Sequence, residues 1–341
     1  MGIVQSCTFY APKIEVVCNE LGLGYYQLVW ETTPRIEGKV KIYISESPTQ
    51  FRRLIPDRVC DIGDNTTSFF LDDSYRRKFF LLVFNNEYEV ITSNREIKLD
   101  GINNFRDVGG YETSNGKQIR WGMLYRSGLI GDLSRNTHIR LGNLRPYTII
   151  DLRPHDPMAR PEIDLPNIQY VRLPIEGIEM ASIADRIYNN EFKRGDAVIF
   201  KQDTYRSFVD HNHTYLSELF DILANHQNYP IIIMGNYGKD RVAIATALIL
   251  HLLGATQETI IQDYVLSNNN LTYLFQFETG VENLSLDTQE AVTYLMNSSE
   301  ENMEDLLLYI TRKYGSLDVY LEEKLGVTRE KRNRIRMNLL Y

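Results

Sequence analysis

Seven consecutive residues in the C-terminal half of the chain combine glycine, a carboxylate and two cations in a way that suits anion binding. They are Gly235, Asn236, Tyr237, Gly238, Lys239, Asp240 and Arg241. Gly238 can adopt backbone conformations closed to other residues, so that successive loop amides converge on one ligand. Arg241 can donate two N–H groups to neighbouring oxygen atoms, and Lys239 adds a point charge. The alternative interpretation is a βα turn that binds nothing and directs its basic side chains to water.

The elements on either side of this loop are expected to be a buried strand and a helix. Residues 230–234 form an apolar run that predicts the strand. Residues 242–253 are apolar almost throughout and precede Gly254, a residue type common just after a helix end. The N-terminus of such a helix carries roughly half a positive charge, which favours an anion at the loop.

Helices and strands alternate over the rest of the chain beyond residue 94. A second buried strand is predicted at residues 147–151, and helices are predicted at residues 215–224, 256–267 and 302–314. Strands that alternate with helices indicate an α/β domain with a mainly parallel central sheet flanked by helices. We place this domain at residues 99–341.

The first hundred residues have a different texture and predict an all-β sandwich over residues 1–98. Short runs rich in Val, Ile, Tyr and Phe lie between turn-type residues, at 13–20, 25–32, 39–47, 67–71 and 78–85. Trp30, in the second run, resembles the buried aromatic residue of a fibronectin type III domain. This resemblance implies a spacer or a module that binds a protein partner.

Segments spread over residues 102–340 resemble, in the right order, the bacterial, lipid-phosphatase-like branch of the cysteine-dependent tyrosine phosphatases. The active-site loop of that family reads His-Cys-x-x-Gly-Lys-Asp-Arg-Thr-Gly, and residues 234–243 read Met-Gly-Asn-Tyr-Gly-Lys-Asp-Arg-Val-Ala. Further matches are Asn-Phe-Arg-Asp-Val-Gly-Gly-Tyr at 104–111, Tyr-Arg-Ser at 125–127, Asp-Leu-Arg at 151–153, Asp-Tyr-Val-Leu-Ser-Asn at 263–268 and Tyr-Gly-Ser at 314–316. The resemblance implies an α/β phosphatase domain.

The sequence departs from this family where the chemistry is done. The resemblance implies a cysteine that attacks phosphorus and an aspartate, here Asp240, that protonates the leaving oxygen. Gly235 stands at the position of the cysteine, Met234 replaces the preceding histidine, and Val242 replaces the assisting threonine. The cysteines of the chain are Cys7, Cys18 and Cys60, and none lies in the α/β domain.

We therefore expect a pseudophosphatase whose loop binds phosphate or a phosphorylated ligand. Asp240 and Arg241 are then retained remnants of the catalytic set. One alternative is an active or residually active phosphatase that hydrolyses phosphotyrosine, phosphoserine or phosphoinositide monoesters. A second is an interaction protein whose loop has lost its function, but such a loop has no physical reason to keep two cations together.

Three other groups of polar residues have a structural interpretation beside a functional one. Residues 210–213 (Asp-His-Asn-His) could hold a metal, but without a partner cluster a solvated loop or helix cap is preferred. Asp151 and Arg153 could lie at the rim of the site or join strand ends by a salt bridge. Arg106 and Asp107 could form an internal ion pair.

Composition limits the remaining functions. The chain has 341 residues, with 37 Lys and Arg against 45 Asp and Glu, and a formal net charge of -8. This balance argues against nucleic acid as a partner. No apolar run is long enough for a transmembrane segment, and no metal or cofactor is expected. We expect a soluble, cytoplasmic chain, and leave open an export or lipoprotein signal removed before this chain begins.

Overall fold

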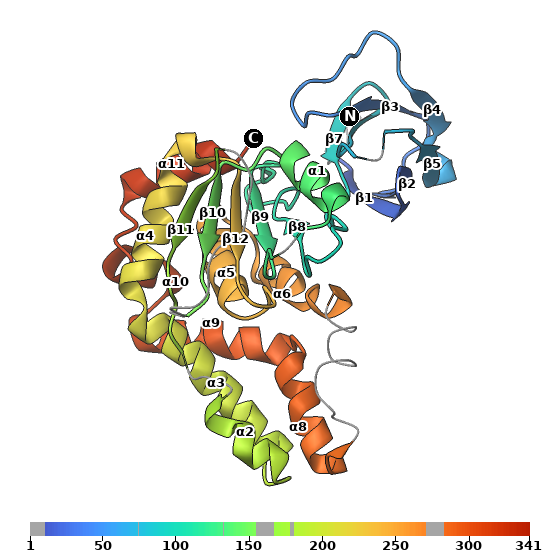
Figure 1. The fold of residues 1–341 in the computed structure, drawn as a ribbon. Helices are drawn as coiled ribbons and strands as arrows, with labels where there is room; N and C mark the ends of the chain where they lie inside the picture. Colours follow the sequence, from blue (N-terminus) through green and yellow to red (C-terminus); the bar gives the residue numbers. More distant parts are fainter. Residues whose placement is uncertain (1–10, 74, 132, 155–166, 178–180, 271–282) are drawn as a thin grey trace, which may run out of the picture. The chain divides into compact units, whose positions relative to one another are not determined.

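The computed structural model describes residues 11–73, 75–131, 133–154, 167–177, 181–270 and 283–341 (Figure 1). The chain divides into two compact units, Met1–Arg95 and Glu96–Tyr341. We describe each unit by itself. No helix in the described ranges has the length and apolar character needed to cross a membrane.

The first unit consists of two antiparallel sheets. One has the order β1-β2-β5 and the other the order β4-β3-β6-β7. The strands are β1 (Lys13–Gly22), β2 (Tyr25–Thr33), β3 (Lys39–Ser45), β4 (Arg58–Asp61), β5 (Thr66–Phe70), β6 (Phe79–Phe84) and β7 (Tyr88–Thr92). The five predicted strands are therefore found, and the sequence pattern missed β4 and β7.

Alternation along the strands builds the core of the first unit. In β2, Tyr26, Leu28 and Trp30 are buried while the residues between them are more exposed, as period-two geometry requires. These side chains pack against Phe80 and Phe84 of the facing sheet. The Trp30 indole also donates a hydrogen bond of 2.8 Å to the carbonyl oxygen of Ile62, which satisfies its polar group inside the core.

The second unit is built on a five-stranded sheet with the order β11-β10-β12-β9-β8. Its strands are β8 (Arg106–Asp107), β9 (Leu124–Ser127), β10 (Thr148–Asp151), β11 (Gln169–Arg172) and β12 (Ile231–Met234). The pairs β11-β10, β10-β12 and β12-β9 are parallel, and β8 is antiparallel to β9. The predicted α/β fold with a mainly parallel sheet is confirmed.

Helices cover both faces of this sheet, because its strands are apolar on both sides. In β12, Ile231 and Ile233 belong to one large core cluster, whereas Ile232 and Met234 belong to a second cluster on the other face. The helices are α1 (Arg135–Asn143), α2 (Ala181–Tyr188), α3 (Arg194–His211), α4 (His213–Ala224), α5 (Arg241–Leu253), α6 (Gln257–Val265), α8 (Leu286–Met296), α9 (Glu300–Tyr314), α10 (Leu317–Val319) and α11 (Arg329–Leu339). Leu141 of α1 packs in the second cluster, and α3 to α6, α9 and α11 contribute to the first.

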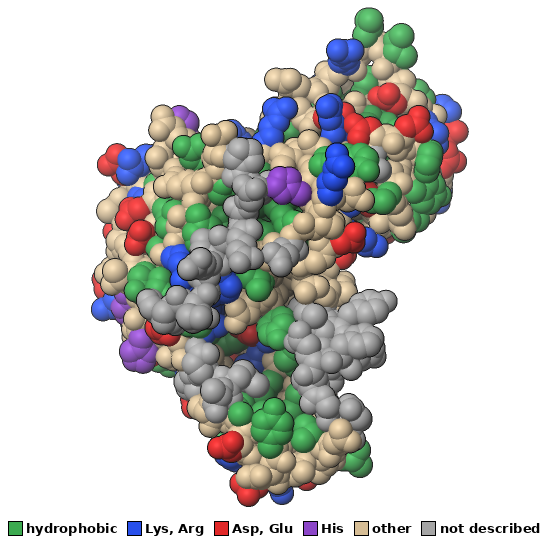
Figure 2. Space-filling view, viewed as in Figure 1, with side chains coloured by type: hydrophobic (Ala, Val, Ile, Leu, Met, Phe, Trp, Pro, Cys, Tyr) green, Lys and Arg blue, Asp and Glu red, His purple; other side chains and the backbone are tan. Residues whose placement is uncertain are grey.

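Charged side chains are mixed on the visible surface. On the face shown in Figure 2, Lys and Arg are interspersed with acidic, polar and hydrophobic side chains.

Candidate anion site

The loop from Gly235 to Arg241 joins the end of β12 to the start of α5. In the parallel register, Met234 lies opposite Asp151 of β10 and Ser127 of β9. The loop thus begins at the carboxyl ends of the central strands, the edge where α/β sheets bind ligands. Helix α5 starts at Arg241, so its N-terminus adjoins the loop as the sequence predicts.

Three consecutive carbonyl groups of the loop are held from one side. The carbonyl oxygen of Asn236 accepts from the Leu129 amide (2.9 Å), and that of Tyr237 accepts from the Asn104 side-chain amide (3.1 Å). The carbonyl oxygen of Gly238 accepts from the Arg126 guanidinium (2.6 Å). In a trans peptide the following N–H points opposite to the carbonyl. The amides of the next residue in each case therefore face away from the segment that holds the carbonyls, as in an anion-binding nest.

The backbone requires glycine at position 238. Its φ of +67° is in the left-handed region, and a Cβ there would lie 2.5 Å from the carbonyl oxygen of Ser127. Position 235 is different, because a Cβ there would meet only the Cγ2 methyl of Val242, at 3.1 Å. A small side chain can therefore be built at position 235 after a slight shift of Val242, so the conformation does not demand glycine.

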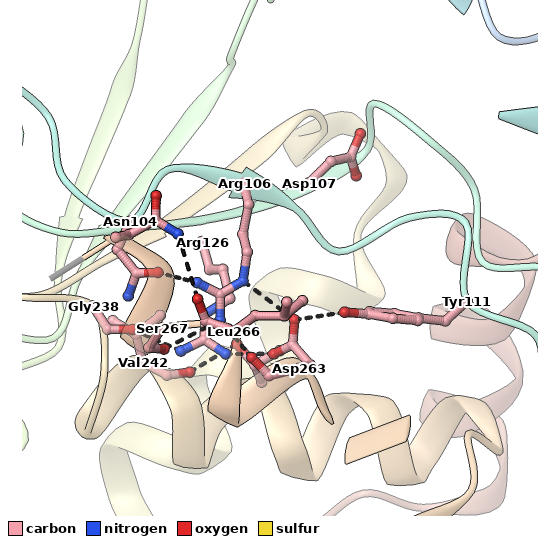
Figure 3. Close-up of polar contacts among 12 residues, drawn as sticks. Asn104, Arg106, Asp107, Tyr111, Arg126, Gly238, Val242, Asp263, Leu266 and Ser267 are labelled. Carbon is pink, nitrogen blue, oxygen red and sulfur yellow. Dashed lines mark hydrogen bonds and ion pairs between the residues drawn. The ribbon is translucent and has the colours of Figure 1, made fainter. Parts of the chain in front are cut away.

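A buried polar cluster lies behind Gly238 (Figure 3). Arg126 forms a short ion pair with Asp263 of α6, and the Arg106 Nε lies 3.4 Å from the same carboxylate. Arg106 also donates to the Asp263 carbonyl oxygen (2.6 Å) and, by a short contact, to the Asn104 side-chain oxygen. The Tyr111 hydroxyl donates to Asp263 at 3.0 Å. The cluster thus connects the segment after residue 103 and helix α6 to the loop.

Lys239 and Asp240 are held by helices α3 and α8. The Lys239 ammonium donates to the Asp240 carboxylate (2.7 Å) and to the carbonyl oxygen of Leu295 at the end of α8 (2.9 Å). The Tyr205 hydroxyl of α3 donates to Asp240 at 2.6 Å. Lys201, also from α3, donates to the same Leu295 carbonyl oxygen at 3.3 Å. Lys239 is therefore buried, and its charge is paired within the protein, so its side chain is not directed to water as in the alternative interpretation.

These contacts shift the pKa values of Asp240 and Lys201. Burial opposes ionisation of Asp240, but the charges of Lys239 and Lys201 outweigh it and lower its pKa to about 2. Burial, together with the charge of Lys239, lowers the pKa of Lys201 to about 7. Asp240 is thus held as a carboxylate by its two cationic neighbours.

Arg241 extends from the first turn of α5 toward helix α3. Its Nε donates a hydrogen bond of 2.8 Å to the carbonyl oxygen of Ile175. The guanidinium carbon lies 5.1 Å from the centre of the Phe208 ring, within the range of a cation–π contact. The orientation of this guanidinium is thus set by two segments that precede the loop.

The other polar residues singled out in the sequence have structural contacts. Arg153 forms an ion pair with Asp151 (2.8 Å), the last residue of β10, and Asp151 also accepts from the Tyr170 hydroxyl of β11. The predicted salt bridge is present, but it is local, because it joins residues two apart in the chain and not two strands. Asp151 lies opposite Met234 and thus next to the loop.

The prediction that Arg106 and Asp107 form an ion pair is wrong, because each has other partners. Arg106 pairs with Asp263, whereas Asp107 accepts from the amides of Gly109 and Gly122, both at 2.7 Å. Successive residues of a strand point to opposite faces, and Figure 3 shows Asp107 pointing away from the cluster.

The Asp210–His213 segment is a junction between two helices and not a solvated loop; Asn212 is the cap residue that ends α3 and begins α4, as the helix-cap interpretation expected. Asp210 belongs to the last turn of α3 and accepts from Tyr309, Tyr314 (2.6 and 2.7 Å) and Lys313 (2.7 Å). His213 is the first residue of α4, and its ring packs against the rings of Tyr314 and Tyr320. Among the described residues, no group of three His, Cys, Asp or Glu side chains is placed to hold a metal ion.

Sequence reasoning missed Lys201, Tyr205, Arg126 and Asp263 as parts of this site. Arg126 and Asp263 lie in segments that the sequence comparison singled out, at 125–127 and 263–268, but nothing local shows that they pair. Lys201 and Tyr205 lie in α3, and their partners Leu295 and Asp240 are distant in sequence.

Comparison with known proteins agrees with the geometry of the second unit. The profile described as the tyrosine phosphatase family matches residues 97–341. A candidate tyrosine-protein phosphatase of Cupriavidus necator is 26% identical over 243 residues, which cover 70% of this chain and 86% of that protein. The triple specificity protein phosphatase PtpB of Mycobacterium tuberculosis is 26% identical over 278 residues, 71% of this chain and 98% of that protein.

Among solved structures, the core catalytic domain of the PP-IP phosphatase SIW14 from S. cerevisiae, in complex with citrate, is 17% identical. It covers 57% of this chain and 88% of its own, with a TM-score of 0.29, too low to support an argument about fold. The family profile, by contrast, covers well over half of the chain and includes the whole loop and the cluster behind it. On that match, this chain belongs to the tyrosine phosphatase family.

Proposed function

We propose that this chain is a pseudophosphatase: it binds a phosphorylated ligand in the loop from Gly235 to Arg241 and lacks the nucleophile that would cleave it. One observation carries the proposal. The three successive carbonyl groups of residues 236–238 are all held from one side, so that the amides behind them face the other way. This arrangement suits phosphate oxygens, and the N-terminus of α5 adds its partial positive charge.

The absence of covalent chemistry rests on position 235. Gly235 stands where the family has its cysteine, and the described cysteines, Cys18 and Cys60, lie in the first unit. The backbone tolerates a small side chain at position 235, so the glycine reflects lost chemistry more than conformational need.

The first unit has the strand orders expected of a fibronectin type III-like sandwich, namely β1-β2-β5 facing β4-β3-β6-β7. The buried Trp30 and the cross-sheet aromatic contacts support this assignment. We propose that residues 1–98 are such a module and that it binds a protein partner. Residues 99–341 then form the phosphatase-like domain.

The alternative function is residual hydrolysis of phosphate monoesters, and it is favoured by the names of the relatives, which are phosphatases. Water could attack a phosphate held by the loop, but without a covalent intermediate the rate would be low. Binding and turnover are therefore measured together on the same protein.

The test compares the full chain with an Arg241→Ala variant. Calorimetry with inorganic phosphate should show binding to the chain at millimolar concentration or tighter, weakened about tenfold or more by the substitution. Hydrolysis of an aryl phosphate should be equally low for both proteins. Turnover that depends on Arg241 would show an active enzyme, and absence of phosphate binding to the unaltered chain would overturn the proposal.

A reconstruction of the nucleophile tests the same idea from the other direction. A Gly235→Cys, Val242→Thr variant places a thiol at the loop and restores the hydroxyl that the family has at position 242; a small shift of this side chain accommodates the new Cβ. Met234 is left unchanged, because it is fully buried in an apolar cluster where an imidazole would be costly. The matched control is Gly235→Ala, Val242→Thr. Hydrolysis by the cysteine variant alone would support an intact scaffold with a deleted nucleophile.

A further inference from the structure

Arg126 makes two contacts that connect the loop to the interior of the second unit. It lies in β9 and is completely buried. One guanidinium nitrogen pairs with the Asp263 carboxylate, and the other donates to the Gly238 carbonyl oxygen at 2.6 Å. Figure 3 shows these contacts converging behind the loop. Arg126 touches the backbone of the loop from the side opposite to the amide of Lys239.

The charges in this cluster are unequal. The guanidinium groups of Arg106 and Arg126 share the carboxylate side chain of Asp263, and all three side chains are buried. Burial, followed by the charge of Arg126, lowers the pKa of Arg106 to about 10. The buried positive charge is thus imperfectly balanced by the contacts in Figure 3, and an anion beyond the Gly238 peptide would help to balance it.

We propose that Arg126 is a positioning residue of the anion site, which acts on a bound phosphate through the Gly238–Lys239 peptide. The inference rests on the proposed function, since it assumes that phosphate occupies the loop. The hydrogen bond to the Gly238 carbonyl orients this peptide and polarises it, so the Lys239 N–H becomes a stronger donor on the far face. The bound anion in turn stabilises the guanidinium charge behind the loop.

Asn104 has a parallel role at the preceding peptide. Its side-chain amide donates to the Tyr237 carbonyl oxygen at 3.1 Å, and its oxygen accepts from Arg106. The cluster therefore holds two successive peptides of the loop, one through a charged donor and one through a neutral donor. The charged contact is expected to contribute more, because hydrogen bonds with an ionised partner are the stronger kind.

The test measures phosphate binding to Arg126→Met and Arg126→Lys in the full chain. The Met variant leaves Arg106 and Asp263 as a buried ion pair with no net charge, so we expect the second unit to fold without the Arg126 guanidinium. We expect its Kd for inorganic phosphate to rise about tenfold or more, and the Lys variant to recover part of that loss. The control is Arg332→Met, which removes an ion pair to Asp318 and should leave the Kd within about twofold.

A spectroscopic signal separates positioning from general stability. In protein labelled with ¹⁵N-lysine, addition of phosphate should shift the backbone amide resonance of Lys239, and this shift should be lost in Arg126→Met. A variant that melts earlier but binds phosphate as the unaltered chain does would overturn the inference and leave the proposed function standing. An Arg126→Lys variant that binds no better than Arg126→Met would also overturn it.

A second variant keeps the test decisive if Arg126→Met does not fold. Asn104→Asp is nearly isosteric and suits the positive φ of this residue (55°). It replaces the donor to the Tyr237 carbonyl with a carboxylate, and should weaken phosphate binding about threefold to tenfold. Unchanged binding in this variant would contradict the role of the cluster, whereas a failure of the unaltered chain to bind phosphate would reject the proposed function itself.

Discussion

The two glycines of the loop differ in what their missing side chain does. Gly238 has a left-handed backbone and lies against the Ser127 carbonyl, so any Cβ would collide with main chain. Gly235 meets only a movable methyl of Val242. The sequence alone does not distinguish these two glycines. In the structure, glycine is required by the backbone at position 238, whereas position 235 has room for a small side chain.

Gly238→Ala tests the conformational requirement. We expect it to cost more than about 3 kcal/mol of unfolding free energy, because left-handed strain and a main-chain clash add together. The matched control is Gly116→Ala, where φ is +76° but nothing lies within 4 Å of the added Cβ. The Gly116→Ala variant should lose about 1 kcal/mol of unfolding free energy, because it introduces backbone strain without a clash. Urea unfolding of the two variants measures the difference, and equal costs would contradict the predicted clash.

Asp240 should make stability depend on pH in a defined window. Its folded-state pKa, about 2, lies below the ordinary value of 3.8, so its stabilisation is complete above about pH 4 and is lost as the pH falls toward 2. The unfolding free energy of Asp240→Asn, measured with urea, should therefore be roughly 1–2 kcal/mol below that of the unaltered chain at pH 5–7. This difference in unfolding free energy should narrow below pH 4. The exposed Asp203, 3.6 Å from Arg206, provides the control Asp203→Asn, whose gap should be small throughout.

At the scale of elements, the sequence predicted those whose apolar pattern is strong. Strand β12 and helix α5, which flank the loop, are buried along almost their whole length and were found within a residue of their ends. Strands β4 and β7 lie at sheet edges and are largely exposed or half-buried, so they lack the alternation that marks a core strand. Edge strands owe their conformation to the neighbour that they pair with, which a local pattern does not contain.

The contacts that build the site were beyond prediction for a related reason. The loop itself is a local motif and could be identified, but the donors to its carbonyls come from residues 104, 126 and 129. Which of the many arginines in the chain meets Gly238 depends on the order of strands in the sheet. The position of β9 beside β12 decides it, because the register places Ser127 opposite Met234.

The cluster around Asp210 yields a prediction about how helices α3 and α9 are joined. Although burial opposes it, hydrogen bonds from Lys313, Tyr309 and Tyr314 lower the pKa of Asp210. Asp210→Asn should reduce the unfolding free energy by about 1–3 kcal/mol, because a partly buried acceptor of three hydrogen bonds loses its charge. Zinc or a chelator should leave the Tm of the chain unchanged. A rise in Tm with zinc that disappears in His211→Ala or His213→Ala would instead indicate a metal site at this segment.

At the scale of the whole molecule, function and stability are divided between two cores. Trp30, Phe80 and their neighbours form the main core of the first unit, and the clusters around β12 form those of the second. The hydrogen bonds that hold the loop carbonyls, Lys239 and Arg241 come from residues of the second unit. The net charge of -8 therefore says little about the anion site, whose cations are buried or paired locally.

This division predicts that phosphate binding does not require the first unit. Residues 96–341 produced alone should bind inorganic phosphate with a Kd within about twofold of the full chain, since no described loop contact is removed. In the full chain, Trp30→Ala should destabilise the first unit by about 3–5 kcal/mol and leave the affinity unchanged. Calorimetry gives the affinity, and thermal unfolding followed by fluorescence of Trp121, in the second unit, reports on that unit. A loss of binding of about tenfold or more on removal of the first unit would show that it contributes to the site, and the assignment of the loop contacts to one unit would then be wrong.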